Sequence, residues 1–261
     1  MRIAIIGAGN MGGAIACALA KTKHFSPSDI ICTTKTQASL QRLRSRNADL
    51  SLMLNNRVAT AAADIVLLAV KPWLMQQVVD ELRPSLDLSR QIIISVAAGI
   101  TLSDLCQMLG DEQATIFRLI PNTAIEVMQS MTFVCSRNAN EAQQELIMQI
   151  FNQTGRVMAV EENKIEAGTA LASCGIAFAM RYIRAAGEAG VELGFRAHEA
   201  HAIVEQTVKG AAELLLSKGA HPEVEIDKVT TAGGITIKGL NELEHAGFTS
   251  AVIRGHKACL K

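Results

Sequence analysis

The chain has 261 residues and balanced charge, with 25 Lys and Arg against 25 Asp and Glu. This balance gives no electrostatic footprint for nucleic acid or an anionic membrane. The six cysteines form no C-x-x-C pair, which argues against a zinc or redox motif. Because we find no leader pattern and no apolar run near the roughly 20 residues of a membrane span, we expect a cytoplasmic protein with reduced thiols.

The first 160 residues alternate near-continuous apolar runs with helical patterns. The expected strands are residues 2–7, 29–34, 64–70, 91–99, 114–120, 131–136 and 155–160. The expected helices are 10–22, 36–45, 73–82, 101–110 and 141–153, with Thr101 or Ser103 capping the fourth of them. Apolar strands separated by helices are typical of a parallel sheet covered on both faces. We therefore predict an α/β fold with a doubly wound, Rossmann-type, mostly parallel sheet.

The pattern changes at about Glu161, where strand-like runs disappear. A long stretch, 162–194, carries small residues on several faces and should be a helix buried on several sides. A second helix is expected over 196–219, ending at Gly219, and two shorter ones on either side of Gly247. The sequence thus predicts a nucleotide-binding domain at 1–160 and an all-helical domain at 161–261.

A G-x-G-x-x-G motif follows the first strand and opens the first helix. Its residues are Gly7, Ala8, Gly9, Asn10, Met11 and Gly12. In this context the motif predicts a dinucleotide pyrophosphate at the helix N-terminus. No acid follows the second strand, where NAD enzymes hold the ribose 2′-OH; Thr33, Thr34, Lys35 and Thr36 stand there instead. These side chains favour NADPH, with NADH as an alternative, although the threonines can also cap the next helix.

Three more loops follow expected strands and should line the nicotinamide end of the site. They contain Ala69, Val70, Lys71 and Pro72, then Val96, Ala97 and Ala98, then Asn122. Lys71 is the only cation among them, and a solvated lysine is the alternative interpretation. His198 and His201 could share a metal, but no third ligand is evident, so we predict none. We also find no support for covalent catalysis, because no sequence motif pairs Cys174 with a histidine.

A second glycine turn lies in the stretch VTTAGGITIKGL, residues 229–240. Gly233 and Gly234 should expose backbone N–H groups at a helix start, flanked by the hydroxyls of Thr231 and Thr236. Free N–H donors, the helix dipole and hydroxyl donors make a site for a carboxylate. A helix cap with a glycine hinge is the alternative.

Taken together, these motifs resemble the pyrroline-5-carboxylate reductase family over nearly the whole chain. The matching segments are GAGNMG at the start, AVKP at 69–72, SVAAGIT at 95–101, PNT at 121–123, TTAGGITIKGL and GFTSAVIRGHKAC. The resemblance implies reduction of the C=N bond of 1-pyrroline-5-carboxylate to L-proline, the last step of proline biosynthesis. It also implies that 161–261 is the substrate and dimerisation domain, with the helical domains of two chains interlocked and the active site formed between the chains. Dimers would assemble further into rings, such as five dimers in a decamer.

The resemblance assigns residues by position. Gly7 to Gly12, Thr34, Asn56, Ala69 to Pro72 and Val96 to Ala98 would hold NADPH. Thr231, Gly233, Gly234 and Thr236 would hold the substrate carboxylate, with the Thr236 hydroxyl beside the carboxylate or the imine nitrogen.

The chain departs from the family pattern near the substrate. The family loop S-P-G-G-T-T reads T-A-G-G-I-T here, and Ala124 replaces the second proline of P-N-T-P. Residues 172–178, ASCGIAF, replace S-G-S-G-P-A-Y. Three alternatives stay open: a reductase of another cyclic imino acid, a 3-hydroxy-acid dehydrogenase, for which Lys164 is poorly placed, or a non-catalytic NADP-binding regulatory paralogue.

Overall fold

The computed structural model describes residues 1–260, which fall into two compact units, Met1–Ser173 and 174–260. The first unit holds the sheet, and the second is entirely helical in the part that the structure describes. The segment 161–173 belongs to the first unit, whereas the sequence pattern placed it in the second. The domain boundary at 160 stays a prediction.

The first unit is built on one eight-stranded sheet with the order β3-β2-β1-β4-β5-β6-β7-β8. The strands are β1 Ile3–Ile6, β2 Ile30–Thr33, β3 Ser51–Met53, β4 Ile65–Leu68, β5 Ile92–Ser95, β6 Ile116–Ile120, β7 Ser130–Arg137 and β8 Gly155–Ala159. All neighbouring pairs are parallel except β6 with β7. The chain direction across the sheet reverses between β1 and β4, which makes their carboxyl ends the topological switch point where such folds bind ligands. The predicted fold class is confirmed.

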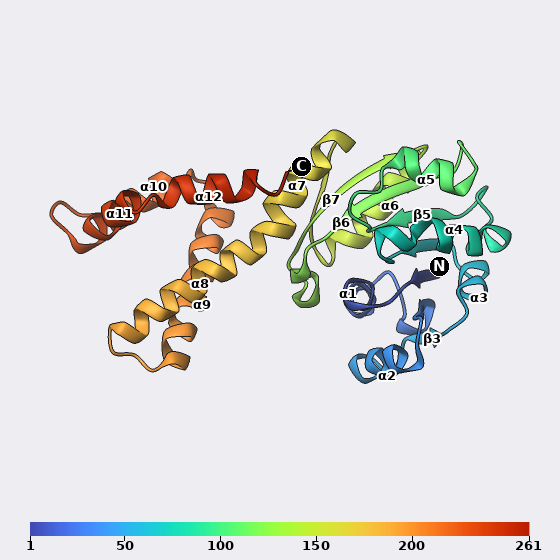
Figure 1. Ribbon diagram of the computed structural model, residues 1–261, viewed down its shortest axis with the longest axis horizontal. Coiled ribbons are helices and arrows are strands. Elements are labelled where there is room, and N and C mark those ends of the chain that lie inside the picture. The colour runs from blue at the N-terminus through green and yellow to red at the C-terminus, as the bar shows by residue number, and fades with distance from the viewer. Residues whose placement is uncertain (261) are drawn as a thin grey trace. The chain divides into compact units, whose positions relative to one another are not determined.

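Helices cover both faces of this sheet (Figure 1). They are α1 Asn10–Leu19, α2 Gln37–Arg46, α3 Asn56–Ala61, α4 Met75–Leu82, α5 Leu102–Leu109, α6 Glu141–Asn152 and α7 Ile165–Gly168. Short 3-10 turns lie at η1 Pro27–Asp29, η2 Pro72–Leu74, η3 Arg83–Ser85, η4 Thr123–Val127 and η5 Glu162–Lys164. Thr101 is the residue that caps α5, in a reciprocal capping box with Asp104.

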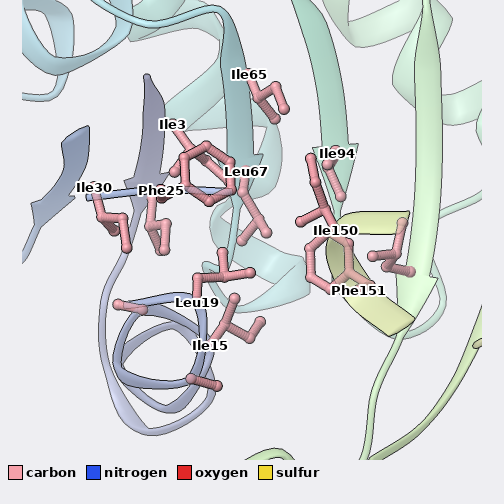
Figure 2. Close-up of a cluster of buried hydrophobic side chains, with 14 of the residues drawn as sticks. Ile3, Ile15, Leu19, Phe25, Ile30, Ile65, Leu67, Ile94, Ile150 and Phe151 are labelled. Carbon is pink, nitrogen blue, oxygen red and sulfur yellow. The ribbon is translucent and has the colours of Figure 1, made fainter. Parts of the chain in front are cut away.

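Two hydrophobic clusters form the core, one on each face of the sheet. Alternate residues of β1 serve both, since Ile3 and Ile5 belong to one cluster and Ala4 and Ile6 to the other. Side chains of α1 and α6 point toward the sheet in the first cluster, among them Leu19 and Phe151 (Figure 2). Burial on both faces explains why these strands are almost entirely apolar.

The long helix expected over 162–194 is interrupted. After α7 the chain forms a π-helical stretch, η6 Thr169–Cys174, before α8 Gly175–Glu192. The hydroxyl of Thr169 donates to the carbonyl of Ile165 at 2.7 Å. The wider turn releases main-chain groups for other partners, which is why such stretches are frequent at functional sites.

The second unit contains α8, α9 Ala197–Lys218, α10 Pro222–Val229, α11 Ile235–His245 and α12 Phe248–Lys257. Helices α8 and α9 lie side by side (Figure 1), and a Cβ on Gly190 would come within 2.8 Å of the Ala200 Cβ. Two expectations are corrected here. Three helices rather than two follow α9, because Pro222 starts an additional one, α10. Only Gly187 of α8 is buried within the single chain, so the predicted burial on several sides is not satisfied by this unit alone.

An apolar groove of about 840 Å³ runs along the second unit between α8 and α12. Its lining includes Phe178, Tyr182, Phe248 and Val252, all exposed. Within residues 1–260, no helix combines the length and apolar character that crossing a membrane requires.

Candidate cofactor and substrate sites

The turn between β1 and α1 depends on two of its glycines. Gly7 has φ +87°, a left-handed conformation that favours glycine, and its carbonyl oxygen faces Gly12. A Cβ on Gly12 would lie 2.7 Å from that oxygen and 2.9 Å from the Cβ of Ala69. The tight approach of α1 to the loop after β4 therefore requires glycine at this position.

The N-terminus of α1 is open to a ligand. Gly9 is the N-cap, no side chain caps the helix, and the first turn contains no acid. Gly9 and Asn10 are exposed, and a Cβ on Gly9 would meet only the Gly7 oxygen, at 4.0 Å. The unpaired N–H groups of the first turn and the positive end of the helix dipole suit a phosphate. These residues fit the pyrophosphate of a dinucleotide.

The threonines after β2 stabilise their own loop. Thr33 is fully buried, and its hydroxyl accepts the N–H of Gly7 at 3.4 Å. The Thr34 hydroxyl donates to the carbonyl of Thr36 at 3.0 Å, and the Thr36 hydroxyl accepts the N–H of Ser39 as the N-cap of α2. The sequence suggested ligand contact or helix capping for these threonines. Only Thr36 caps the helix, whereas the hydroxyls of Thr33 and Thr34 bond to the main chain of nearby loops. Lys35 is exposed.

Two arginines that the sequence analysis did not single out lie beside the glycine turn. Arg42 and Arg46 of α2 line a cavity of about 240 Å³, together with Ala8, Gly9, Asn10, Ser39 and Leu43. Arg46 pairs with Glu126 at 3.5 Å, and Arg42 donates to the Ser39 hydroxyl at 3.0 Å. The helical spacing of residues 39, 42, 43 and 46 could have revealed this face, because i, i+3, i+4 and i+7 positions share one side of a helix.

The loops after β4 and β5 reach the same edge of the sheet as the glycine turn. Ala69 contacts the turn, since its N–H donates to Ile6, and Val70 lies against Gly7. Pro72 starts η2, and Lys71 is exposed with its ammonium 5.9 Å from the ring centroid of Trp73. After β5, Val96 donates its N–H to Leu68, and the loop continues through Ala97 and Ala98.

Two predicted cofactor residues have their side-chain amides engaged by the protein. Asn56, the first residue of α3, donates to the Glu81 carboxylate at 3.3 Å. Asn122 is almost completely buried, donates to the carbonyl of Ala172 at 3.3 Å, and accepts the N–H of Ala124 at 3.2 Å. The Asn122 amide therefore ties the loop after β6 to the π-helical stretch.

The second glycine turn, between α10 and α11, resembles the first in its structure. Gly233 has φ +68°, and Gly234 is the N-cap of α11, without a capping side chain or an acid in the first turn. A Cβ on Gly234 would lie 2.5 Å from the Thr231 hydroxyl oxygen, so glycine lets that hydroxyl approach the helix start. Thr236, in the first turn of α11, is exposed. The N–H of Gly234 is not free as expected, because it donates to the carbonyl of Thr231 at 2.9 Å. The donors offered to an anion are therefore the N–H groups of the first turn of α11 and the hydroxyls of Thr231 and Thr236.

The cysteines and histidines do not gather into a further site. Burial raises the pKa of Cys32 to about 12 and that of Cys135 to about 11, so both remain protonated thiols at neutral pH. The His201 ring packs on α8, where a Cβ on Gly187 would meet it at 2.8 Å. Among the described residues, no group of three or more His, Cys, Asp and Glu is placed to hold a metal ion.

Comparison with known proteins matches both parts of the chain. Residues 162–261 match the family model described as pyrroline-5-carboxylate reductase dimerisation, and residues 2–99 match one described as NADP oxidoreductase coenzyme F420-dependent. The match to the first model shows that the helical region is of an oligomerising type.

Individual relatives agree with these matches. Pyrroline-5-carboxylate reductase 2 of Dictyostelium discoideum is 38% identical, covering 97% of this chain and 89% of the relative. Pyrroline-5-carboxylate reductase 1 of that organism is 39% identical over 97% of this chain, which spans only 47% of the relative's length. The Plasmodium falciparum pyrroline carboxylate reductase, solved with NADP bound, has a TM-score of 0.89 at 26% identity, covering 99% of this chain and 95% of that one. The chain belongs to the pyrroline-5-carboxylate reductase family.

Proposed function

We propose that this protein is a pyrroline-5-carboxylate reductase, which reduces 1-pyrroline-5-carboxylate to L-proline with NADPH, the last step of proline biosynthesis. The observation that carries the proposal is a pair of uncapped helix starts at glycine turns in one chain. The start of α1 suits a pyrophosphate, and the start of α11, flanked by Thr231, suits a carboxylate. The activity for which the family is named uses both kinds of ligand, a dinucleotide and a carboxylate substrate.

The chemistry that we propose needs little from acidic or basic side chains. Bound NADPH would supply the hydride, which adds to the imine carbon that becomes C5 of proline. A cyclic imine is a modest base and can enter as the protonated iminium, so its nitrogen already holds the proton that the product amine keeps. The protein's task is then to hold the ring in position. N–H groups of α11 and the hydroxyls of Thr231 and Thr236 would bind the carboxylate.

NADPH is the cofactor that we propose, with NADH as the weaker alternative. No acidic residue follows β2 or lies in the first turn of α2, so the usual partner of a free ribose 2′-OH is missing there. A cytoplasmic location is part of the same proposal, in keeping with a pathway enzyme that uses a diffusible cofactor.

We further propose that the protein is a homodimer formed through its helical unit, and that dimers assemble further, with a decamer of five dimers as the specific expectation. Support comes from the dimerisation model over residues 162–261 and from the exposed apolar groove along α8 and α12. Monomeric proteins rarely leave a large contiguous apolar surface exposed to water, and such surfaces mark interaction sites. Light scattering on the purified chain measures the mass of the assembly, and a monomer at micromolar concentration would contradict the proposal.

Replacing Thr236 by Ala is expected to lower kcat/KM for 1-pyrroline-5-carboxylate at least about 10-fold, which corresponds to about 1.4 kcal/mol of transition-state binding. The exposed hydroxyl beside the open N–H groups is lost, whereas α11 keeps a good helix former. Steady-state kinetics at saturating NADPH measure the effect.

The matched control is Thr249→Ala, whose hydroxyl donates to Glu244 at 2.7 Å elsewhere in the helical unit. It should leave kcat/KM within about 2-fold. Wild-type kinetics for Thr236→Ala would remove the role assigned to this hydroxyl, and an unchanged Kd for NADPH should accompany the expected loss.

A further inference from the structure

The cavity beside the glycine turn contains a guanidinium that the proposed reaction does not yet use. We propose that Arg42 selects NADPH over NADH by binding the 2′-phosphate of the adenosine ribose. This inference rests on the proposed function only in naming the cofactor, since it concerns the affinity for a nucleotide and no step of the reduction.

The position of Arg42 follows from the topology. In a doubly wound sheet the adenosine ribose lies over the carboxyl end of the strand next to β1, here β2, after the pyrophosphate has been held at the start of α1. The cavity of about 240 Å³ joins these two places, since Gly9 and Asn10 line one side and Ser39, Arg42 and Arg46 of α2 the other. A phosphate on the 2′ oxygen would thus point toward the arginine face of α2.

The hydroxyl groups near β2 are already engaged within the protein, and Lys35, the exposed cation of the same loop, does not line the cavity. The Thr33 hydroxyl is buried against Gly7, the Thr34 hydroxyl donates within its loop, and the Thr36 hydroxyl caps α2. Because these contacts already stabilise the fold, a phosphate would have to break them to gain a hydroxyl partner. The threonines that the sequence favoured for this role therefore discriminate between the cofactors less than a free cation would.

The two arginines of the cavity differ in their partners. Arg46 is held by Glu126 at 3.5 Å, so part of its charge is already compensated. Arg42 forms no ion pair with any carboxylate among residues 1–260, and its one hydrogen bond runs to the hydroxyl of Ser39. Its remaining N–H groups can bind a phosphate in the bidentate geometry that guanidinium favours. Ser39 adds a hydroxyl to the same face.

The test compares Arg42→Ala with Arg44→Ala by isothermal titration calorimetry on the full chain. Arg44 lies on the same helix, is exposed and does not line the cavity, so its removal changes the net charge equally. The ligands are NADPH, NADH, 2′,5′-ADP and 5′-AMP. We expect Arg42→Ala to raise the Kd of NADPH and of 2′,5′-ADP at least about 10-fold, with NADH and 5′-AMP changed less than about 3-fold.

Arg44→Ala should change all four constants less than about 3-fold, which is the general effect of one surface charge. Arg42→Lys, which keeps the charge but loses the planar fork, should fall between wild type and Arg42→Ala. Equal losses for NADPH and NADH in Arg42→Ala, or equal losses in the two alanine variants, would overturn the assignment.

The outcome is independent of turnover. A wild-type protein that binds 2′,5′-ADP through Arg42 but does not reduce 1-pyrroline-5-carboxylate would contradict the proposed function and leave the role of Arg42 intact. A protein that makes proline, but whose affinity for 2′,5′-ADP does not depend on Arg42, would do the reverse.

Discussion

Replacing Gly12 by Ala is expected to weaken NADPH binding at least about 100-fold, or about 2.7 kcal/mol. The added Cβ would lie 2.7 Å from the Gly7 oxygen and 2.9 Å from the Ala69 Cβ, and neither neighbour is the end of a flexible side chain. Helix α1 must therefore move away from β1 and the loop after β4. The N–H groups that would face the pyrophosphate move with it, and titration of NADPH measures the lost affinity.

Gly13 offers a matched control one residue along the same helix. A Cβ there would make ordinary contacts, the nearest being 3.4 Å from a terminal methyl of Leu43. Gly13→Ala should keep NADPH affinity within about 3-fold, and the better helix propensity of alanine should offset any crowding. If Gly12→Ala bound NADPH as tightly as Gly13→Ala, the close approach of α1 would not be a condition for cofactor binding.

The second large effect is expected on stability, from Glu162→Ala. The Glu162 carboxylate accepts a hydrogen bond from the Arg118 guanidinium and another from the N–H of Leu102 at 2.7 Å. Arg118 is 4% exposed, and its Nε lacks a hydrogen-bond partner, so this carboxylate supplies its compensation. Leaving the buried guanidinium unpaired should lower the free energy of unfolding by about 3 kcal/mol.

Glu161 is the control for that experiment. It is exposed, and within residues 1–260 its carboxylate accepts a single hydrogen bond, from the Asn163 amide at 3.3 Å. Glu161→Ala should therefore change the free energy of unfolding by less than about 0.5 kcal/mol. Urea unfolding followed by far-ultraviolet circular dichroism measures both variants, at one protein concentration because assembly adds to stability. Indistinguishable midpoints for the two variants would show that Arg118 finds another partner or tolerates its burial.

The sequence predicts the parallel sheet well because its strands are buried on both faces. Ile3–Ile6 and Ile65–Leu68 are apolar at every position, and such short runs between helical patterns have few other interpretations. Strand β3 escaped prediction since Ser51–Met53 is three residues long and half-buried at the sheet edge. Helix α3 was not predicted because it is only six residues long, which is too short to show a clear helical period.

In the second unit, the sequence does not distinguish burial within one chain from burial against another chain. An apolar position on α8 indicates burial, but the sequence does not say whether the covering surface comes from the same chain. Phe178 and Tyr182 are exposed in the single chain, so the expected burial requires another molecule. The π-helical stretch could not be predicted from the sequence either, because Thr169–Cys174 has the composition of an ordinary helix. Tertiary hydrogen bonds tie this stretch to the loop at Asn122.

For the site, motifs located the turns but not all of the side-chain roles. Gly7 to Gly12 and Gly233–Gly234 adopt helix-start turns, as their spacing predicted. Roles for Thr33 and Asn122 could not be deduced in this way, because their side chains bond to residues distant in sequence. The role that we propose for Arg42 has no sequence motif, because a basic residue on an amphipathic helix is usually solvated.

The second glycine turn contains the two most important departures from the family pattern. Ile235, the first residue of α11, is 88% exposed, where the family pattern has a threonine, and Ala232 replaces a proline. These changes motivate the alternative of an NADP-binding regulator that keeps the fold without turnover. The open N–H groups and Thr236 remain, and on the present account they suffice to bind the carboxylate.

The most direct test is to incubate the purified protein with NADPH and 1-pyrroline-5-carboxylate and to measure both NADPH consumption and proline formation. We expect catalytic turnover, with one proline formed for each NADPH oxidised and faster initial rates with NADPH than with NADH at equal subsaturating concentrations. Tight NADPH binding without proline formation, in a protein that assembles normally, would contradict the account and support the regulatory alternative.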